Sequence, residues 1–284
     1  MERIFEPKAM QDLALSWRAQ GLTVGLVPTM GYWHEGHLSL ILWARERCDM
    51  LVTSIFVNPT QFGPGEDLDN YPSDLARDAG LAETCGVDAL FCPSKRTMYA
   101  PDHGTWINVP DVARNLCGKT RPNHFQGVAT VVCKLFNLVQ PTFAVFGEKD
   151  WQQLAVIRKM TRDLDIPVRI EGRPIVREPD GLALSSRNVY LTPEERAVAP
   201  HIQKGLCVLE DLIRVGQRDP GRLRTAVSAY YRQHIPTGQL DYLELVDPRR
   251  IEPVERLGAD VLAAVALRLG KARLIDNKYI TIEA

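Results

Sequence analysis

The sequence has few of the features that mark an exported or metal-stabilised protein. It contains six cysteines in 284 residues, and none of them form a Cys-x-x-Cys pair with the spacing of a zinc site. Some lie among apolar residues, as Cys133 does after Val131 and Val132. We therefore expect reduced thiols that pack as small hydrophobic side chains. The six are Cys48, Cys85, Cys92, Cys117, Cys133 and Cys207.

Long apolar runs are also lacking. A helix that spans a bilayer needs about 20 consecutive apolar residues, and the longest candidate, Val261 to Leu267, is far shorter. The first residues, Met1 to Gln11, carry charges and have no apolar core segment, unlike a secretory signal. These absences predict a cytoplasmic protein with no membrane partner.

Net charge is nearly absent, since 34 Lys and Arg stand against 35 Asp and Glu and give a formal charge of −1. Nucleic-acid binders usually present a basic face, so we expect no nucleic-acid partner. A local pocket lined by a few cationic side chains stays compatible with this balance. Hydrophobic residues make up 45% of the chain, enough for a substantial core without a metal or disulfide.

The first part of the chain alternates strand-like and helix-like segments. Apolar, β-prone runs at 22–27, 51–57, 89–91, 142–146 and 168–170 alternate with helical patterns at 38–48, 75–85, 128–139 and 151–162. Repeated β-α units with crossover helices predict an α/β fold, with a parallel sheet covered on both faces.

The pattern changes after about Arg177. The run Thr192 to Glu195 has a Thr N-cap, a proline in the first turn and two acidic residues, which is typical of a helix start. Helical segments continue to about His234, and short strands are expected at 242–246, 261–269 and 273–275. We predict two domains, residues 1–176 and a smaller α+β domain of residues 177–284.

The segment from Val27 to His37 carries the strongest chemical signal. It follows the first predicted strand and leads into a helix, and ligands of open parallel sheets bind at such strand ends. A helix N-terminus attracts phosphate, and Gly36 lets a nucleotide approach closely. His34 and His37 can then both donate hydrogen bonds to a triphosphate. A metal site is the weaker interpretation, because no third ligand follows at a clear spacing.

Two further segments follow strands. In the first, Asn58 and Gln61 offer amide groups suited to a small hydroxy acid, although Asn58-Pro59 is equally typical of a turn. In the second, Lys149 can neutralise phosphate and Gln153 lies one turn into the next helix, while the alternative is a solvated Lys149–Asp150 pair.

Two loops add candidates of a different kind. Ser185, Ser186 and Arg187 can form a mobile phosphate clamp, an interdomain linker or both. Arg121 and His124 precede a helix, where they can cap it or anchor a loop.

Together these segments resemble the pantothenate synthetase family. The resemblance runs from about Leu22 to Pro193 in the family's order and continues weakly beyond. The His-x-Gly-His pattern alone resembles only the wider nucleotidyltransferase superfamily, which includes class I aminoacyl-tRNA synthetases. One departure is Tyr32-Trp33, where the family usually has a small and then an aliphatic residue. The resemblance implies a homodimer, with a Rossmann-like N-terminal domain and a C-terminal lid domain.

The resemblance also implies a reaction and its residues. ATP, (R)-pantoate and β-alanine would give pantothenate, AMP and diphosphate through pantoyl adenylate, with Mg²⁺ held by phosphate oxygens and water and contacted indirectly by Asp78. His34, His37, Lys149 and Arg187 would be catalytic. Gln61 and Gln153 would bind pantoate, and Gln61 also β-alanine. The implied ATP-binding residues are Met30, Gly31, Tyr32, Trp33, His34, Glu35, Gly36, His37, Gly147, Glu148, Lys149, Asp150, Val176, Leu184, Ser185, Ser186 and Arg187.

Two alternatives remain at this stage. A nucleotidyltransferase with a phosphate acceptor would leave the Gln61 and Gln153 segments unexplained. A non-catalytic tRNA-binding relative of a synthetase is opposed by the near-neutral charge.

Overall fold

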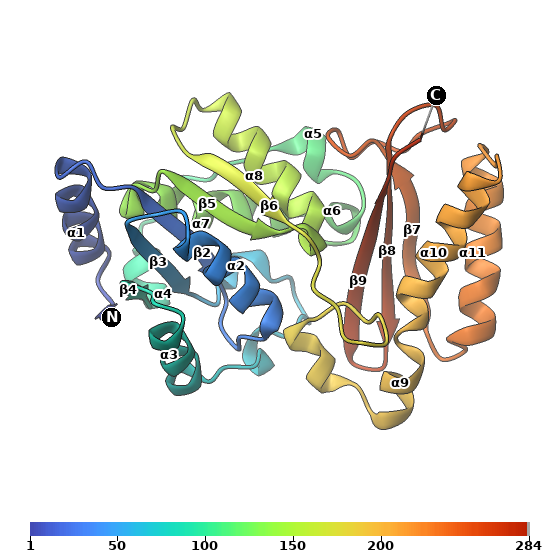
Figure 1. Ribbon diagram of the computed structural model, residues 1–284, viewed down its shortest axis with the longest axis horizontal. Helices are drawn as coiled ribbons and strands as arrows, with labels where there is room; N and C mark the ends of the chain where they lie inside the picture. Colours follow the sequence, from blue (N-terminus) through green and yellow to red (C-terminus); the bar gives the residue numbers. More distant parts are fainter. Residues whose placement is uncertain (283–284) are drawn as a thin grey trace. The chain divides into compact units, whose positions relative to one another are not determined.

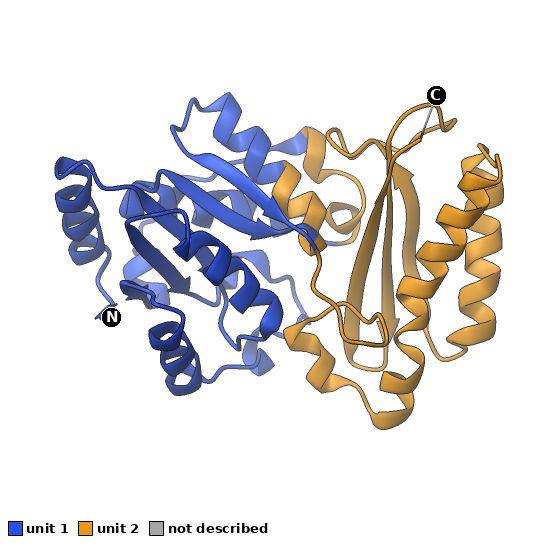
Figure 2. Ribbon diagram, in the orientation of Figure 1, with its two compact units in different colours: residues 1–110, 121–148, 156–174 blue, residues 111–120, 149–155, 175–284 orange. Residues whose placement is uncertain are grey.

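The computed structural model describes residues 1–282, and the chain divides into two compact units (Figure 2). Unit 1 comprises residues 1–110, 121–148 and 156–174. Unit 2 comprises residues 111–120 and 149–155 together with the chain from residue 175 onward. Two short segments from the middle of the sequence therefore belong to the same unit as the C-terminal part.

Unit 1 is built on a six-stranded parallel sheet with the order β1-β4-β3-β2-β5-β6 (Figure 1). The strands are β1 (Glu2–Ile4), β2 (Val24–Thr29), β3 (Met50–Ile55), β4 (Ala89–Phe91), β5 (Phe143–Gly147) and β6 (Arg169–Arg173). The chain order reverses between β2 and β5, which are paired directly. Ligands bind at such a reversal, beyond the carboxyl ends of the strands. The segments after Thr29 and after Gly147 leave the sheet at this edge.

Helices cover both faces of this sheet. One face carries α2 (Glu35–Arg45) and α3 (Leu75–Thr84), whose apolar residues share a core with Val27, Leu51 and Phe143. The neighbouring side chain Leu26 must point to the opposite face of the strand, where α1 (Pro7–Ala19) and α7 (His124–Val139) pack together and against β2. Shorter helices are α4 (Lys95–Met98), η1 (Pro59–Gln61) and η2 (Leu68–Asn70). The predicted parallel α/β fold is confirmed.

Unit 2 contains a three-stranded antiparallel sheet in the order β7-β8-β9. Its strands are β7 (Gln239–Val246), β8 (Val261–Leu269) and β9 (Ala272–Ile280), and its helices are α5 (Pro110–Ala113), α6 (Cys117–Thr120), η4 (Ser186–Tyr190), α9 (Pro193–Val198), α10 (His201–Arg214) and α11 (Pro220–His234). Apolar residues of α10 and α11 form one core with the sheet, as Leu206, Val227 and Val265 illustrate. The smaller α+β part is also confirmed. The remaining helices are η3 (Glu148–Asp150) and α8 (Trp151–Asp163), and both include residues of the segment 149–155.

Several elements differ from the sequence prediction. The N-terminal β1 and α1 were missed, although Met10, Ala14 and Trp17 recur at helical spacing and are buried. The helix predicted from Val128 begins at His124. The last strand was expected to end at Ile275 but continues to Ile280, because the polar pair after Ile275 is buried rather than forming a turn.

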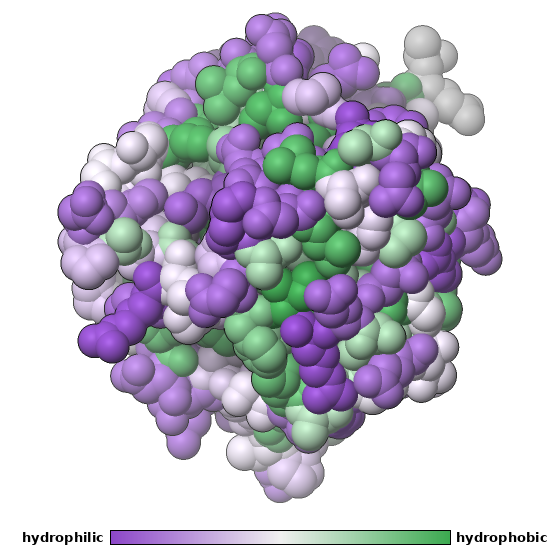
Figure 3. Space-filling model, turned by 90° about the vertical axis from the view of Figure 1, so that its left-hand side faces the viewer, coloured by the Kyte–Doolittle hydropathy of each residue, from purple (hydrophilic) through white to green (hydrophobic). Residues whose placement is uncertain are grey.

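The surface mixes apolar and charged side chains. Figure 3 shows green apolar patches interrupted by purple hydrophilic groups on one side of the molecule. Unit 1 exposes single large apolar side chains, among them Phe5, Leu15 and Leu42, and scattered exposure of this kind is normal. Within residues 1–282, every helix is too short or too polar to cross a lipid bilayer.

Candidate active site

The first cluster lies where β2 ends and α2 begins. His34 is the N-cap of α2, and its Nδ1 accepts a hydrogen bond from the Gly36 backbone N–H at 3.1 Å. The Nδ1 of His37 accepts from the His34 N–H at 3.3 Å, and the two ring centroids lie 4.1 Å apart. An imidazole whose Nδ1 accepts carries the proton of its neutral form on Nε2. Each neutral ring is thereby set as a donor at Nε2.

A buried carboxylate holds the loop before α2. Asp78 of α3 is 1% exposed, and its two oxygens accept from the N–H groups of Tyr32 at 2.6 Å and Trp33 at 2.9 Å. Tyr32 has a φ of 55° and Gly31 one of 90°. Such a left-handed backbone costs a non-glycine residue about 1–2 kcal/mol, which the two hydrogen bonds to Asp78 offset.

The carboxyl of Asp78 is buried against the backbone that it holds. Burial raises the pKa of its carboxyl, and the two backbone N–H donors act in the opposite direction. Both oxygens face the backbone of the loop, so the side chain positions residues 31–33. The indirect Mg²⁺ contact expected of Asp78 stays a prediction. No group of three or more potential metal-ligating side chains occurs among residues 1–282.

Trp33 fits into the core of unit 1 despite its size. It is 1% exposed, and its indole Nε1 donates to Thr29 Oγ1 at 2.9 Å. The Thr29 hydroxyl donates in turn to the Ser54 carbonyl at 2.8 Å, which links β2 to β3. The indole N–H is thus satisfied where it is buried. The Tyr32-Trp33 departure is accommodated by this bond and by the contacts of Asp78.

Gln61 lies at the end of η1, and buried groups hold its side chain. Asn58 donates through Nδ2 to Gln61 Oε1 at 3.2 Å and to the Gly127 carbonyl at 3.1 Å. Its own Oδ1 accepts from Tyr99 Oη at 3.1 Å. Gln61 Nε2 donates to Met30 Sδ at 3.2 Å, which brings a predicted pantoate residue to a predicted ATP residue. Asn58 is 1% exposed, so it both shapes the turn and orients Gln61.

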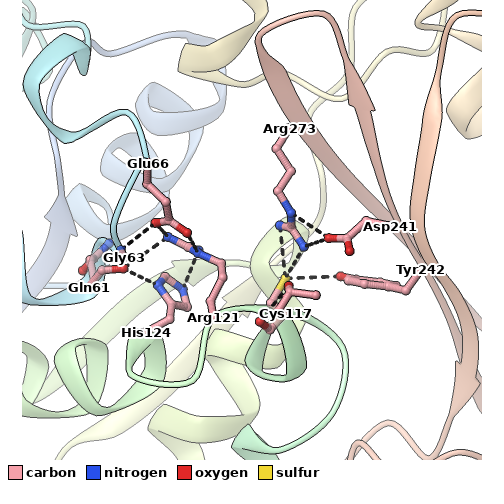
Figure 4. Close-up of polar contacts among 10 residues, drawn as sticks. Gln61, Gly63, Glu66, Cys117, Arg121, His124, Asp241, Tyr242 and Arg273 are labelled. Carbon is pink, nitrogen blue, oxygen red and sulfur yellow. Dashed lines mark hydrogen bonds and ion pairs between the residues drawn. The ribbon is translucent and has the colours of Figure 1, made fainter.

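The backbone of Gln61 is fixed by the start of α7 (Figure 4). Its carbonyl accepts from His124 Nδ1 at 2.9 Å and from Arg121 at 3.2 Å. A carbonyl only accepts and a guanidinium only donates, so His124 carries its proton on Nδ1 and accepts from Arg121 at Nε2, 3.2 Å away. Arg121 also pairs with Glu66 through two contacts of 2.5 Å. Arg121 and His124 therefore anchor the loop, one of the two roles expected for them.

The Glu66 carboxyl belongs to the same hydrogen-bond network as Gln61, Arg121 and His124. It accepts from the Gly63 N–H at 3.1 Å as well as from Arg121. Burial acts to raise its pKa, but the hydrogen bonds and charge of Arg121 outweigh that effect, and the pKa lies below the ordinary value. Glu66 is thus held as a carboxylate that ties the turn after η1 to α7. The sequence prediction did not include it.

The predicted residues around Lys149 lie at the end of β5 and the start of α8. Gly147 ends β5, Lys149 and Asp150 lie in η3, and Gln153 lies in the first turn of α8. The neighbouring Gln152, which sequence reasoning passed over, is buried. Its Oε1 accepts from the Cys117 N–H at 3.0 Å, and its Nε2 donates to the Val112 and Asn115 carbonyls at 3.0 and 2.7 Å. It fastens the segment 111–120 to the start of α8.

The last predicted segment forms a small hairpin that ends in a capped turn. The Leu184 N–H donates to the Val176 carbonyl at 3.0 Å, so these two predicted ATP residues are paired across the hairpin. Ser185 caps η4 by accepting from the Arg187 N–H at 3.3 Å. Ser186 is 7% exposed. The proposed mobility of this segment stays a prediction.

Comparison with known proteins gives a consistent result. The sequence pattern of the family described as pantoate-beta-alanine ligase matches residues 3–279. Curated pantothenate synthetases from Maridesulfovibrio salexigens and Solidesulfovibrio magneticus are each 57% identical to the chain. The first alignment covers 99% of this chain and 100% of the relative, and the second covers 98% of each.

Two solved structures extend the similarity to the fold. The pantothenate synthetase of Thermus thermophilus matches with a TM-score of 0.92 and 44% identity, over 99% of this chain and 100% of that one. The pantoate-beta-alanine ligase of Francisella tularensis, complexed with beta-gamma ATP and beta-alanine, matches with a TM-score of 0.78 and 33% identity, over 98% and 97% of the two chains.

Proposed function

The chain belongs to the pantoate–β-alanine ligase family, and we propose that it condenses (R)-pantoate with β-alanine at the expense of ATP through a pantoyl adenylate. A carboxylate is a poor acylating agent, because its leaving group would be oxide. Adenylation replaces that leaving group with AMP. The relative from Francisella tularensis, whose structure holds beta-gamma ATP and beta-alanine, supports these two substrates.

The reaction consists of two displacements. A pantoate carboxylate oxygen forms a bond to the α-phosphorus of ATP, and the bond from that phosphorus to the diphosphate oxygen breaks. The neutral amine of β-alanine then bonds to the acyl carbon, and the carbon–oxygen bond to AMP breaks. The proton lost by the amine passes to solvent. The first displacement requires positioning and neutralisation of spreading phosphate charge.

The proposed residue roles follow the two steps. His34 and His37 donate to phosphate oxygens through Nε2, and Lys149 and Arg187 neutralise the departing diphosphate. Gln61 and Gln153 hold pantoate, and Gln61 also reaches β-alanine. The other ATP contacts come from the segments 30–37, 147–150, 176 and 184–186.

One observation carries this proposal beyond family membership. The two imidazoles at the carboxyl end of β2 both accept at Nδ1 from backbone N–H groups. That arrangement fixes both tautomers before any ligand binds. Preorganised donors at a strand end and helix start favour a phosphate ligand.

An isotope experiment tests the adenylate directly. With pantoate labelled by ¹⁸O in its carboxylate, one labelled oxygen stays on phosphorus when AMP departs. We expect ¹⁸O in AMP and pantoate-dependent exchange of labelled diphosphate into ATP without β-alanine. Unlabelled AMP together with no exchange would rule out the pantoyl adenylate.

The remaining proposals concern the surroundings of the reaction. ATP enters as its Mg²⁺ complex, and the ion belongs to the substrate. The chain works as a homodimer in the cytoplasm. Sedimentation of the purified protein tests the dimer, and omission of Mg²⁺ from the exchange assay tests the metal requirement.

A further inference from the structure

Two consecutive polar residues of β9 are almost fully buried. Asp276 is 3% exposed and Asn277 is 6% exposed, although the strand around them is largely apolar. Successive side chains of a strand point to opposite faces, so this pair can serve two different partners. Burial of polar groups costs free energy unless they are hydrogen-bonded. The hydrogen-bond partners of Asp276 and Asn277 therefore explain why two polar residues occur in the interior.

Asn277 holds the turn that carries Lys149. Its Nδ2 donates to the Lys149 carbonyl at 2.8 Å. Two residues further along each segment, Tyr279 of β9 stacks on Trp151 with a centroid distance of 5.6 Å and an interplanar angle of 22°. The Trp151 indole donates to the Pro248 carbonyl at 2.8 Å. The turn η3 is thus fixed to β9 through the backbone carbonyl of Lys149 and not through its ammonium group.

Asp276 holds the hairpin that leads to Arg187. Its carboxylate pairs with both terminal nitrogens of Arg177, at 2.6 and 2.9 Å. The same guanidinium donates to the Gly181 carbonyl at 3.1 Å. Arg177 therefore closes the hairpin and attaches it to β9 in one geometry. A bidentate pair of this kind fixes orientation as well as distance.

The two anchors are joined to each other. The Asn277 backbone N–H donates to Asp276 Oδ1 at 2.8 Å. The same strand also reaches the third segment of unit 2, because Arg273 contacts Cys117 Sγ at 3.5 Å (Figure 4). β9 is thus the common support of segments that are far apart in the sequence.

We propose that Asp276 and Asn277 are positioning residues that attach the Lys149 turn and the hairpin leading to Ser185–Arg187 to one strand, as two parts of one phosphate-binding site. This inference rests on the phosphate roles proposed above for Lys149 and Arg187. In this proposal Asp276 and Asn277 act through the segments they hold and not by contact with substrate. Asn277 holds the Lys149 backbone directly and Asp276 holds the hairpin through Arg177, so that both cations return to one mutual geometry when ATP binds. Misplacement of reacting groups by about 1 Å can cost roughly 100-fold in rate.

The test compares Asn277→Ala and Asp276→Asn with Lys278→Met in the full chain. Lys278 lies on the same strand and forms an ion pair with Glu210 at 2.7 Å, without contacting either segment. We expect both variants to lower pantoate-dependent ATP–diphosphate exchange or raise the KM for ATP by roughly 10- to 100-fold. Amine attack on preformed pantoyl adenylate should change less than threefold, since diphosphate has already left. Lys278→Met should leave both half-reactions near wild type.

Amide hydrogen exchange supplies a readout that does not depend on activity. Asn277→Ala should speed exchange in the peptide around Lys149, and Asp276→Asn should speed it in residues 176–187. If Asp276→Asn does not fold, Arg177→Lys tests the same contact. Equal losses in both half-reactions, or variants that match Lys278→Met, would overturn the inference. Absence of pantoate-dependent exchange in the wild type would instead refute the proposed function.

Discussion

At the residue scale, His34 combines a structural and a proposed chemical task. Its Nδ1 caps α2 through the Gly36 N–H, a contact typically worth about 1 kcal/mol. Donation to phosphate requires Nε2. Asparagine keeps a capping oxygen but is too short to place a donor where Nε2 lies, so His34→Asn separates the two tasks.

We expect His34→Asn, His34→Ala and His37→Ala each to slow ATP–diphosphate exchange by roughly 100- to 1000-fold, the usual loss for one preorganised donor. Urea unfolding should show a lower stability for His34→Ala than for His34→Asn. Near-normal exchange in all three variants would contradict the assignment of the imidazoles.

Gln61 is proposed to bind pantoate, and protein groups hold it in place. Asn58, His124 and Arg121 fix its side chain and its carbonyl. We expect Gln61→Ala to weaken pantoate binding more than ATP binding, since a site built to hydrogen-bond a ligand discriminates strongly when a partner is lost. Calorimetric titration of each ligand measures the two affinities. A similar loss for both would count against this role.

At the element scale, α3 and the loop before α2 are coupled through Asp78. Asp78→Asn leaves one acceptor for two N–H groups and should destabilise the left-handed Tyr32. Glycine adopts that backbone freely. We therefore expect Asp78→Asn to cost less stability and less exchange activity in a Tyr32→Gly background than in the wild type. The two changes should be non-additive, as for residues in contact, and strict additivity in denaturant unfolding and in exchange would refute the coupling.

We expect the free energy of unfolding to depend on pH through Glu66, which holds the loop after η1. Its pKa in the folded protein lies below the ordinary value of 4.5. Such a group contributes stability that is present above the unfolded pKa and is lost as pH falls through the folded pKa. The stability difference between wild type and Glu66→Gln should thus be full at pH 6 and shrink as pH falls below 4.5. Glu83→Gln, which breaks only an exposed pair with Arg3, is the control and should cost little. A pH-independent difference for Glu66→Gln would contradict the prediction.

Apolar periodicity predicted most helices and strands of unit 1 but missed β1 and α1. The alternation of apolar runs was enough to predict β2, β3, β5 and the helices between them. β1 was missed because two of its three residues, Glu2 and Arg3, are charged and exposed, whereas the equally short β4 is entirely apolar. The polar pair Asp276–Asn277 ended the predicted strand early, because a single sequence does not reveal that Arg177 and the Lys149 carbonyl satisfy it in the interior.

The candidate site was likewise only partly predictable from the sequence. The places of His34, His37 and Gln61 just after β2 and β3 were predictable from the sequence, while their roles stay predictions. Asp78, Glu66 and Gln152 were not assigned their positioning roles, since each acts on a backbone that only the fold brings near.

At the scale of the whole molecule, the match over residues 3–279 distinguishes between the hypotheses that the His-x-Gly-His pattern leaves open. It favours the ligase over a transferase with a phosphate acceptor and over a tRNA-binding relative. The next two predictions concern how the protein would respond to ATP.

The Ser185–Arg187 segment is the part whose order should depend on ATP. Its backbone is held locally, since Ser185 Oγ accepts from the Arg187 N–H and Asn188 donates to the Ala183 carbonyl at 3.1 Å. Holding the whole segment closed against local opening costs conformational entropy, which phosphate contacts would offset. We expect slower amide exchange in residues 184–190 when a nonhydrolysable ATP analogue is bound. Equal exchange with and without the analogue would refute the ordering.

The same reasoning predicts how the two half-reactions divide. Arg187 can pair with phosphate oxygens through a planar fork that lysine does not reproduce. Arg187→Lys should therefore slow adenylate formation strongly and amine attack on preformed pantoyl adenylate much less, because diphosphate has left by then. Arg196→Lys, which alters only the nearby pair with Asp180, should affect neither step. Rapid-quench measurement of each half-reaction decides the matter, and an unchanged first step in Arg187→Lys would mean that Arg187 does not act on the departing diphosphate.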